Sequence, residues 1–331
     1  MPIKVEQDTK EPSMEDDVFD IDTPVQPTQP TTVTTSPPNT NDMMAAMQAF
    51  AKVFASGQVD ETKIRQIINE EMKKFVRART LKVVIAGNVT GDIPGIKHKA
   101  LATIIKMVSN KVNVMMVGPP GVGKTTIANQ VAKAMSLPFY FNGAIASEYK
   151  LAGFIDAQGK IVSTPFRKAF ESGGVYLFDE VDASLPSALL AFNAALSNEM
   201  ADFPDGRIER HKDFYCLAAA NTYGLGADRM FVGRNQIDAA TLDRFAVVDV
   251  DCDEEMEKLI TQNDAWFQRV VTIRKAVNSL KIRHIVSPRA SYYGAALLAA
   301  GLPQNTVEES LIWRSMEGDT RKRVLNEIDG K

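Results

Sequence analysis

Short apolar runs alternate with helix-like stretches along the chain from about residue 93 onward. Residues 112–117 form one such run and end at a glycine, and the following stretch, 125–135, places Ile127, Val131 and Ala134 on one helical face. Continuous apolar runs between helices are typical of a parallel sheet covered on both faces. The pattern predicts an α/β fold with strands at Val112–Val117, Phe139–Phe141, Val175–Phe178, Phe214–Ala220 and Ala246–Val250.

The periodicity changes after Asp251, where the chain becomes wholly helical apart from a break near Ser287-Pro288. This predicts a small α-helical lid domain at residues 252–331, behind an α/β domain at residues 81–251. Upstream, residues 43–80 carry two apolar stripes at helical spacing, one beginning at Met43 and one at Ile64. This helical segment is too short for a good core of its own, so it docks either on the main domain or on a neighbouring subunit.

Residues 1–42 have a different composition. They contain seven prolines, eight threonines, nine acidic residues and only two basic residues. Such a segment buries too little apolar surface to offset its ordering entropy, which predicts a disordered acidic tail. The tail is either a solubilising extension or a tether for a partner.

The remaining residues are close to neutral, with 36 basic and 32 acidic side chains, so charge does not favour a nucleic-acid-binding surface. No apolar stretch approaches the roughly 18 residues that a membrane span requires. The N-terminus does not resemble a secretory signal, and two cysteines, Cys216 and Cys252, are too few for a disulfide framework. Together these features predict a cytoplasmic protein.

The strongest chemical signal is a glycine-rich turn between a predicted strand and a predicted helix. Its glycines let several backbone N–H groups point into one concavity at the positive end of the helix, where phosphates bind. In this P-loop pattern the lysine reaches the β- and γ-phosphates and the next hydroxyl ligates Mg²⁺. The predicted nucleotide-binding residues are Gly118, Pro119, Pro120, Gly121, Val122, Gly123, Lys124, Thr125 and Thr126, together with Asp179.

An acidic pair, Asp179-Glu180, directly follows the apolar run Val175–Phe178. Carboxylates at the end of a buried strand are costly unless a cation meets them. Asp179, with Thr125, is therefore predicted to hold Mg²⁺, and Glu180 to act as general base on the attacking water. Asn221, at the end of another predicted strand, either orients that water or only caps the following loop.

Two arginines follow in short motifs. Arg244 stands in Leu-Asp-Arg-Phe before the last predicted strand, and Arg289 in Ser-Pro-Arg-Ala opens a helix of the predicted lid. Arg244 would project outward from the end of a helix, and Arg289 would point back toward the nucleotide. Taken singly, an arginine in such a place is more often a solvated or ion-paired surface residue.

Taken together, these motifs resemble AAA+ ATPases, and their order resembles the dynein-related branch that contains the MoxR-type and cobaltochelatase CobS-type ATPases. The resemblance covers roughly residues 93–301. It implies that Asn221 is sensor 1, Arg289 is sensor 2 and Arg244 is the arginine finger that completes a neighbour's site, with Arg229 and Arg234 as alternatives for the finger. A finger supplied by a neighbour implies a homo-oligomeric ring, usually of six subunits.

By the same resemblance, two loops face the centre of the ring and grip a substrate, although ordinary surface loops explain them equally well. One is Tyr149–Phe154. The other, Phe203–Arg207, is predicted to be a hairpin tip with Asp-Gly at the turn.

The sequence thus predicts a Mg²⁺-dependent ATPase that remodels a partner protein, and the resemblance suggests a partner with a von Willebrand A-type domain. The alternative is a nucleic-acid-stimulated motor or clamp loader, for which the basic cluster at residues 73–82 is the one candidate surface. Small relatives also occur in phages, so a host cytoplasm is one possible setting. A third class, a scaffold that binds ATP and barely hydrolyses it, is disfavoured by Glu180.

Overall fold

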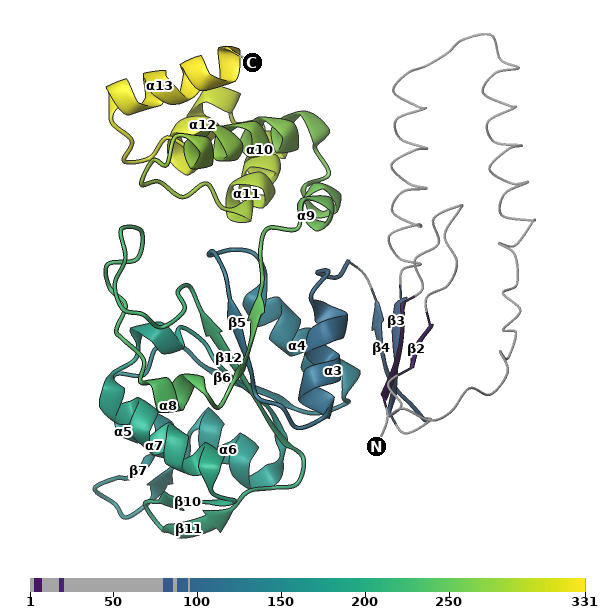
Figure 1. Cartoon of the computed structure of the whole chain (residues 1–331), viewed down its shortest axis with the longest axis vertical. Helices are drawn as coiled ribbons and strands as arrows, with labels where there is room; N and C mark the ends of the chain where they lie inside the picture. Colours follow the sequence, from purple (N-terminus) through teal and green to yellow (C-terminus); the bar gives the residue numbers. More distant parts are fainter. Residues whose placement is uncertain (1–2, 8–17, 21–79, 86–87, 95, 331) are drawn as a thin grey trace, which may run out of the picture. The chain divides into compact units, whose positions relative to one another are not determined.

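A computed structural model describes residues 3–7, 18–20, 80–85, 88–94 and 96–330 (Figure 1). The chain divides into two compact units, residues 1–96 and residues 97–331. The helices predicted at residues 43–80 and the basic cluster at residues 73–82 lie mostly outside the described residues. Thr80 ends the first of these ranges and Thr80–Lys82 end the second, and these residues belong to a strand.

The first unit contains a four-stranded antiparallel sheet in the order β2-β1-β3-β4. Strand β1 pairs over its whole length with β3, from Ile3 opposite Ile85 to Gln7 opposite Leu81. A bulge between Val83 and Val84 interrupts the pairing of β3 with β4. The strands are β1 (Ile3–Gln7), β2 (Val18–Asp20), β3 (Thr80–Ile85) and β4 (Asn88–Pro94).

The predicted boundaries, a disordered tail at residues 1–42 and an α/β domain that begins at residue 81, stay predictions. Strands β1 and β2 lie within the first of these ranges, and β3 and β4 belong to the first unit. β1 acquires its backbone hydrogen-bonding partner from residues more than seventy positions away, and a composition averaged over a segment does not reveal such pairing.

The second unit is built on a five-stranded, fully parallel sheet in the order β13-β5-β12-β9-β6. All five strands were predicted from the apolar runs, and their ends differ from the prediction by no more than two residues. The predicted α/β fold is therefore confirmed. The strands are β5 (Val114–Val117), β6 (Phe139–Asn142), β9 (Gly174–Phe178), β12 (Phe214–Ala220) and β13 (Ala246–Asp249).

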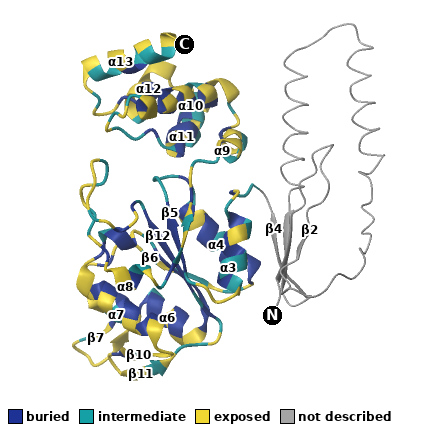
Figure 2. Cartoon of the chain, viewed as in Figure 1, coloured by how far each residue is buried: buried dark blue, intermediate teal, exposed yellow. Residues whose placement is uncertain are grey.

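Helices cover both faces of this sheet (Figure 1). Helices α3 (Leu101–Ser109) and α4 (Lys124–Ala134) lie on one side, and α6 (Pro165–Ser172) and α7 (Pro186–Ser197) on the other. The central strands are buried along their length, as Figure 2 shows. An aromatic cluster packs beneath α6 and α7, in which the rings of Phe178 and Phe192 meet edge to face at 5.0 Å.

Shorter strands and helices lie in the connections between the main elements of this unit. Strands β10 and β11 form the hairpin expected around residues 203–207, but Phe203 pairs with Gly206, so the two loop residues are Pro204 and Asp205 and not Asp-Gly. The bidentate ion pair of Arg167 with Asp205, at 2.6 and 2.7 Å, holds this tip. These elements are α5 (Glu148–Ala152), β7 (Phe154–Ile155), β8 (Ile161–Val162), the 3₁₀ turn η1 (Val181–Ala183), β10 (Met200–Phe203), β11 (Gly206–Glu209) and α8 (Ala239–Leu242).

Five helices follow the sheet and have a core of their own, which confirms the predicted helical lid. At its centre the buried Arg274 donates to both carboxylate oxygens of Glu257, at 2.6 and 2.7 Å, and to the carbonyl of Val286. None of the helices among the described residues is long and apolar enough to cross a membrane. The helices are α9 (Glu254–Thr261), α10 (Asp264–Ser279), α11 (Pro288–Ala299), α12 (Gln304–Leu311) and α13 (Gly318–Asp329).

Candidate nucleotide-binding and hydrolysis site

The glycine-rich turn connects the end of β5 to the first residue of α4. Gly121 and Gly123 have φ angles of 83° and 99°, which only glycine adopts without strain. Position 118 requires glycine for a different reason, because a Cβ atom there would lie 2.1 Å from the carbonyl oxygen of Val250. Gly123 is also the N-cap of α4, so no side chain covers the N-terminus of that helix. The turn leaves the positive end of α4 open to an anion.

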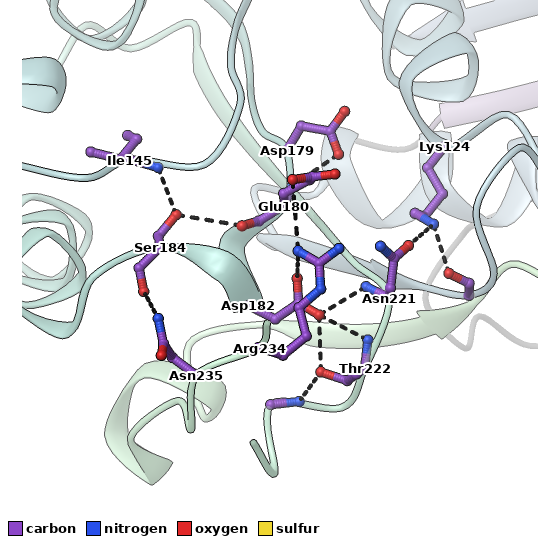
Figure 3. Close-up of polar contacts among 12 residues, drawn as sticks. Lys124, Ile145, Asp179, Glu180, Asp182, Ser184, Asn221, Thr222, Arg234 and Asn235 are labelled. Carbon is purple, nitrogen blue, oxygen red and sulfur yellow. Dashed lines mark hydrogen bonds and ion pairs between the residues drawn. The ribbon is translucent and has the colours of Figure 1, made fainter. Parts of the chain in front are cut away.

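Lys124, the first residue of α4, points its ammonium group into this turn (Figure 3). Nζ donates to the carbonyl oxygens of Gly118 and Pro119, at 2.7 and 3.0 Å, and to Oδ1 of Asn221 at 3.0 Å. All three ammonium donors therefore have neutral oxygen partners. The side chain is only 8% exposed.

Burial is the main cause that lowers the pKa of Lys124 from 10.5 to about 8. The carboxylates of Asp179 and Asp182 oppose that shift, and the positive charges of Arg234 and Arg289 add to it. Burial of an ammonium group is costly unless negative charge lies close to it. The phosphates of a nucleotide would supply such charge at Lys124.

Thr125 and Asp179 bring two oxygen atoms together beside the turn. Thr125 Oγ1 donates to Asp179 Oδ2 at 2.9 Å, and the other carboxylate oxygen of Asp179 accepts from the backbone N–H of Glu180 at 2.9 Å. A hydroxyl and a carboxylate are hard oxygen ligands of the kind that Mg²⁺ takes together with substrate phosphates and water. Among the described residues no set of three or more acidic, histidine or cysteine side chains offers a metal site built from protein alone. The two residues thus fit Mg²⁺ bound jointly with a nucleotide.

Glu180 stands one residue further on, at the start of η1, with a left-handed φ of 52°. Few residues other than glycine adopt this conformation, and it redirects the chain sharply after the buried strand β9. The side chain is 52% exposed and lies 3.7 Å from Arg234 Nη1. It can therefore reach solvent water while keeping one partner inside the protein.

Asp182 is a site residue that the sequence reasoning missed. Its side chain is completely buried, and Oδ2 accepts from the backbone N–H groups of Asn221 and Thr222, at 3.1 and 3.0 Å, and from Thr222 Oγ1 at 2.9 Å (Figure 3). These bonds fix the end of β12 and hence the position of Asn221. The available signal was a third acidic residue two positions after the acidic pair.

The lid contributes Arg289 to the same region. A Cβ atom built on Gly121 would lie 3.0 Å from Arg289 Cγ, so the arginine stem passes next to the glycine-rich turn. Arg289 itself is exposed, on the first turn of α11. The structure therefore brings Lys124, Thr125, Asp179, Glu180, Asn221 and Arg289 into one region. Val122 is buried beneath the turn, and Thr126 is exposed on the first turn of α4.

The three candidates for the arginine finger have different surroundings. Arg244 lies apart from the glycine-rich turn, where Nε donates to Ser197 Oγ at 2.7 Å and Nη1 bonds the carbonyl of Ala240. Arg229 is exposed in the loop before α8 and forms no ion pair within the described part of the chain. Arg234 points inward, toward Glu180 and Asp182.

The parallel sheet, the glycine-rich turn and the acidic pair after β9 define a P-loop nucleotide-binding domain. The family model of the AAA domain (dynein-related subfamily) matches residues 113–245, from the start of β5 to the residue before β13. The chain thus contains an AAA+ ATPase domain.

Several known proteins resemble this chain over longer stretches. An uncharacterized protein of Staphylococcus epidermidis is 22% identical over 241 residues, which cover 66% of this chain and 89% of that protein. A Lon protease of Finegoldia magna is 31% identical over 160 residues, covering 45% of this chain and 20% of the protease.

Solved structures show looser similarity. RuvB of Thermotoga maritima, a Holliday junction branch migration motor, aligns with a TM-score of 0.42 and 14% identity over 68% of this chain and 72% of its own. NtrX from Brucella abortus aligns with a TM-score of 0.42 and 16% identity over 83% of this chain and 57% of its own. At these TM-scores the two likenesses say nothing about function.

Proposed function

We propose that this protein is a Mg²⁺-dependent ATPase that assembles into a ring and uses hydrolysis to remodel a partner protein. The observation that carries the proposal is the meeting of Lys124, Thr125, Asp179 and Asn221 at the carboxyl ends of three neighbouring strands, β5, β9 and β12. Ligands of open α/β sheets bind at this edge.

ATP would bind with its phosphates in the glycine-rich turn, at the N-terminus of α4. Lys124 would exchange its carbonyl partners for the β- and γ-phosphates, and Asn221 would then be free to contact the γ-phosphate or the water. Thr125 and Asp179 would hold Mg²⁺, which neutralises phosphate charge when bound. Arg289 of the lid would add positive charge over the phosphates.

In hydrolysis, Glu180 would accept a proton from the water whose oxygen attacks the γ-phosphorus. The bond between the γ-phosphorus and the bridging oxygen breaks, and its electron pair stays with ADP. Lys124 and Arg289 would stabilise that developing charge. Glu180 suits the role because its carboxylate is half exposed and follows directly on the Mg²⁺ ligand.

The ring belongs to the proposal because the resemblance to MoxR-type and CobS-type ATPases implies an arginine finger that comes from outside the subunit. A neighbouring subunit would supply one, with Arg244 first and Arg229 second among the candidates. A six-membered ring is the form that the resemblance to MoxR-type and CobS-type ATPases favours. That branch also suggests a partner with a von Willebrand A-type domain in the cytoplasm.

The proposal is tested with the full-length protein. We expect phosphate release from ATP that stops on chelation of Mg²⁺, and a particle in sizing experiments several times the 36.4 kDa mass of one chain when ATP is present. Absence of nucleotide binding would remove the ATPase assignment, and a monomer that hydrolyses ATP would remove the ring. ATPase stimulation by DNA or RNA at low salt, with none by a partner protein, would favour the nucleic-acid motor instead.

A further inference from the structure

Arg234 is the one arginine from the loop between β12 and α8 that turns into the site. Its side chain is only 12% exposed, and Nη1 lies 3.3 Å from Asp182 Oδ1 and 3.7 Å from Glu180 Oε2 (Figure 3). Its charge also reaches Lys124, 110 positions earlier in the sequence. Arg234 therefore lies inside the hydrolytic site of its own subunit.

Asp182 fixes Arg234 in this place. One carboxylate oxygen of Asp182 is occupied by three hydrogen bonds from Asn221 and Thr222, whereas the other accepts no hydrogen bond in the structure and faces Arg234 as an ion pair. Moving Arg234 outward would leave a fully buried carboxylate without its ion-pair partner, which is strongly unfavourable. The ion pair with Asp182 therefore keeps Arg234 in the site of its own chain.

The neighbouring backbone supports the same geometry. Asn235 N donates to the carbonyl of Asp182 at 2.7 Å, and Asn235 Nδ2 donates to the carbonyl of Ser184 at 3.0 Å. These bonds hold the residue after Arg234 against η1 and its C-cap Ser184, directly after Glu180 in the chain. The arginine and the glutamate are therefore held together by backbone as well as by charge.

We propose that Arg234 is a positioning residue that acts within its own subunit and orients the Glu180 carboxylate to accept a proton from the attacking water. Arg234 engages Oε2 and leaves the second oxygen of Glu180 available to the water. Through Asp182 the same arginine links Glu180 to the end of β12, where Asn221 stands. This inference rests on the proposed ATPase function, and it removes Arg234 from the candidates for a finger supplied in trans.

The first test compares Arg234→Ala and Arg234→Lys with the wild-type protein. We expect Arg234→Ala to lower kcat for ATP by roughly 100-fold, the order of loss that a misplaced catalytic group causes. The nucleotide dissociation constant should stay unchanged, and Arg234→Lys should recover part of kcat because it restores the positive charge. An unchanged or increased kcat in Arg234→Ala would overturn the proposal.

A second variant covers the case in which Arg234→Ala fails to fold because Asp182 loses its partner. The double variant Asp182→Asn with Arg234→Gln removes both charges but keeps an oxygen to accept from Asn221 and Thr222. It should fold and bind nucleotide, and it should still hydrolyse ATP slowly. Wild-type kcat in this variant would exclude a positioning role.

Mixing of subunits distinguishes action within a subunit from action on a neighbour. Combining Arg234→Ala with Lys124→Ala subunits should restore no ATPase activity, because every site lacks one of the two residues. Restored activity would show that Arg234 serves the neighbouring site and would overturn the proposal. If the wild-type protein itself has no ATPase activity, the proposed function fails, and that outcome is distinct from failure of this inference.

Discussion

The hydroxyl of Thr125 lies 2.9 Å from the carboxylate of Asp179, although 54 positions separate the two residues in the chain. Thr125 is the second residue of α4, and Asp179 directly follows β9. The contact joins the phosphate-binding turn to the acidic end of a strand. It thereby places the two expected Mg²⁺ ligands on one side of the site.

The first prediction concerns this pair. Thr125→Val has a similar shape but no hydroxyl, so it should lose most Mg²⁺-dependent hydrolysis, whereas Thr125→Ser keeps the oxygen and should retain it. The measurement is phosphate release as a function of Mg²⁺ concentration. Equal Mg²⁺ dependence in the two variants would exclude Thr125 as a ligand.

A second prediction follows from the pKa of Lys124, which burial lowers to about 8. Bound phosphates favour the ammonium form, so nucleotide affinity should fall by up to about tenfold per pH unit as the pH rises above 8. Lys124→Arg, which stays protonated in this range, should show no such fall. Titrations with a fluorescent ATP analogue between pH 7 and 10 make the comparison. Parallel pH profiles in the two proteins would assign the titration to another group.

The same shift has a consequence for stability in the absence of nucleotide. Between pH 8 and 10.5 the unfolded chain holds a proton on Lys124 that the folded chain has lost. The contribution of this group to the free energy of unfolding therefore rises with pH across that window.

Glu180→Gln is the third prediction. The amide cannot accept a proton from water, but it keeps the size of the side chain, so the variant should bind ATP with wild-type affinity and fail to turn it over. It should also accumulate as an ATP-loaded oligomer in sizing experiments. Single-turnover hydrolysis at the wild-type rate would remove Glu180 from the role of general base.

The fourth prediction tests the arginine finger. Arg244→Ala should bind nucleotide but not hydrolyse it, and mixing it with Lys124→Ala subunits should restore activity, because some sites then combine an intact Lys124 with a neighbour's intact Arg244. If that mixture stays inactive while a mixture with Arg229→Ala recovers activity, Arg229 is the finger. If neither recovers, the site is complete within one subunit.

The fifth prediction concerns the lid. Arg274→Ala would leave the fully buried Glu257 without its partner, at a cost of about 3–5 kcal/mol in the stability of the lid. Lys322→Ala, which removes the exposed ion pair with Asp319, is the matched control and should change little. The measurement is the midpoint of thermal or urea unfolding. Equal midpoints in the two variants would contradict a structural role for the buried pair.

The sequence alone determined the elements that depend on neighbouring residues. Apolar runs marked all five strands of the parallel sheet, because a strand buried on both faces needs continuous apolar side chains. The spacing of glycines before Lys124 marked the phosphate-binding turn, because only glycine tolerates those backbone angles. The acidic pair Asp179-Glu180 was also recognisable from the sequence, because two carboxylates at the end of a buried strand are costly unless a cation meets them.

Only the tertiary structure decided which distant side chains meet. It identified Asp182 as the anchor of Asn221, turned Arg234 toward Glu180, and paired Glu257 with Arg274 inside the lid. It also paired β1 with β3, whose residues lie more than seventy positions further along the chain. Each of these contacts joins residues that no local sequence pattern links. The sequence alone does not distinguish a charged side chain that faces solvent from one that pairs with a buried partner.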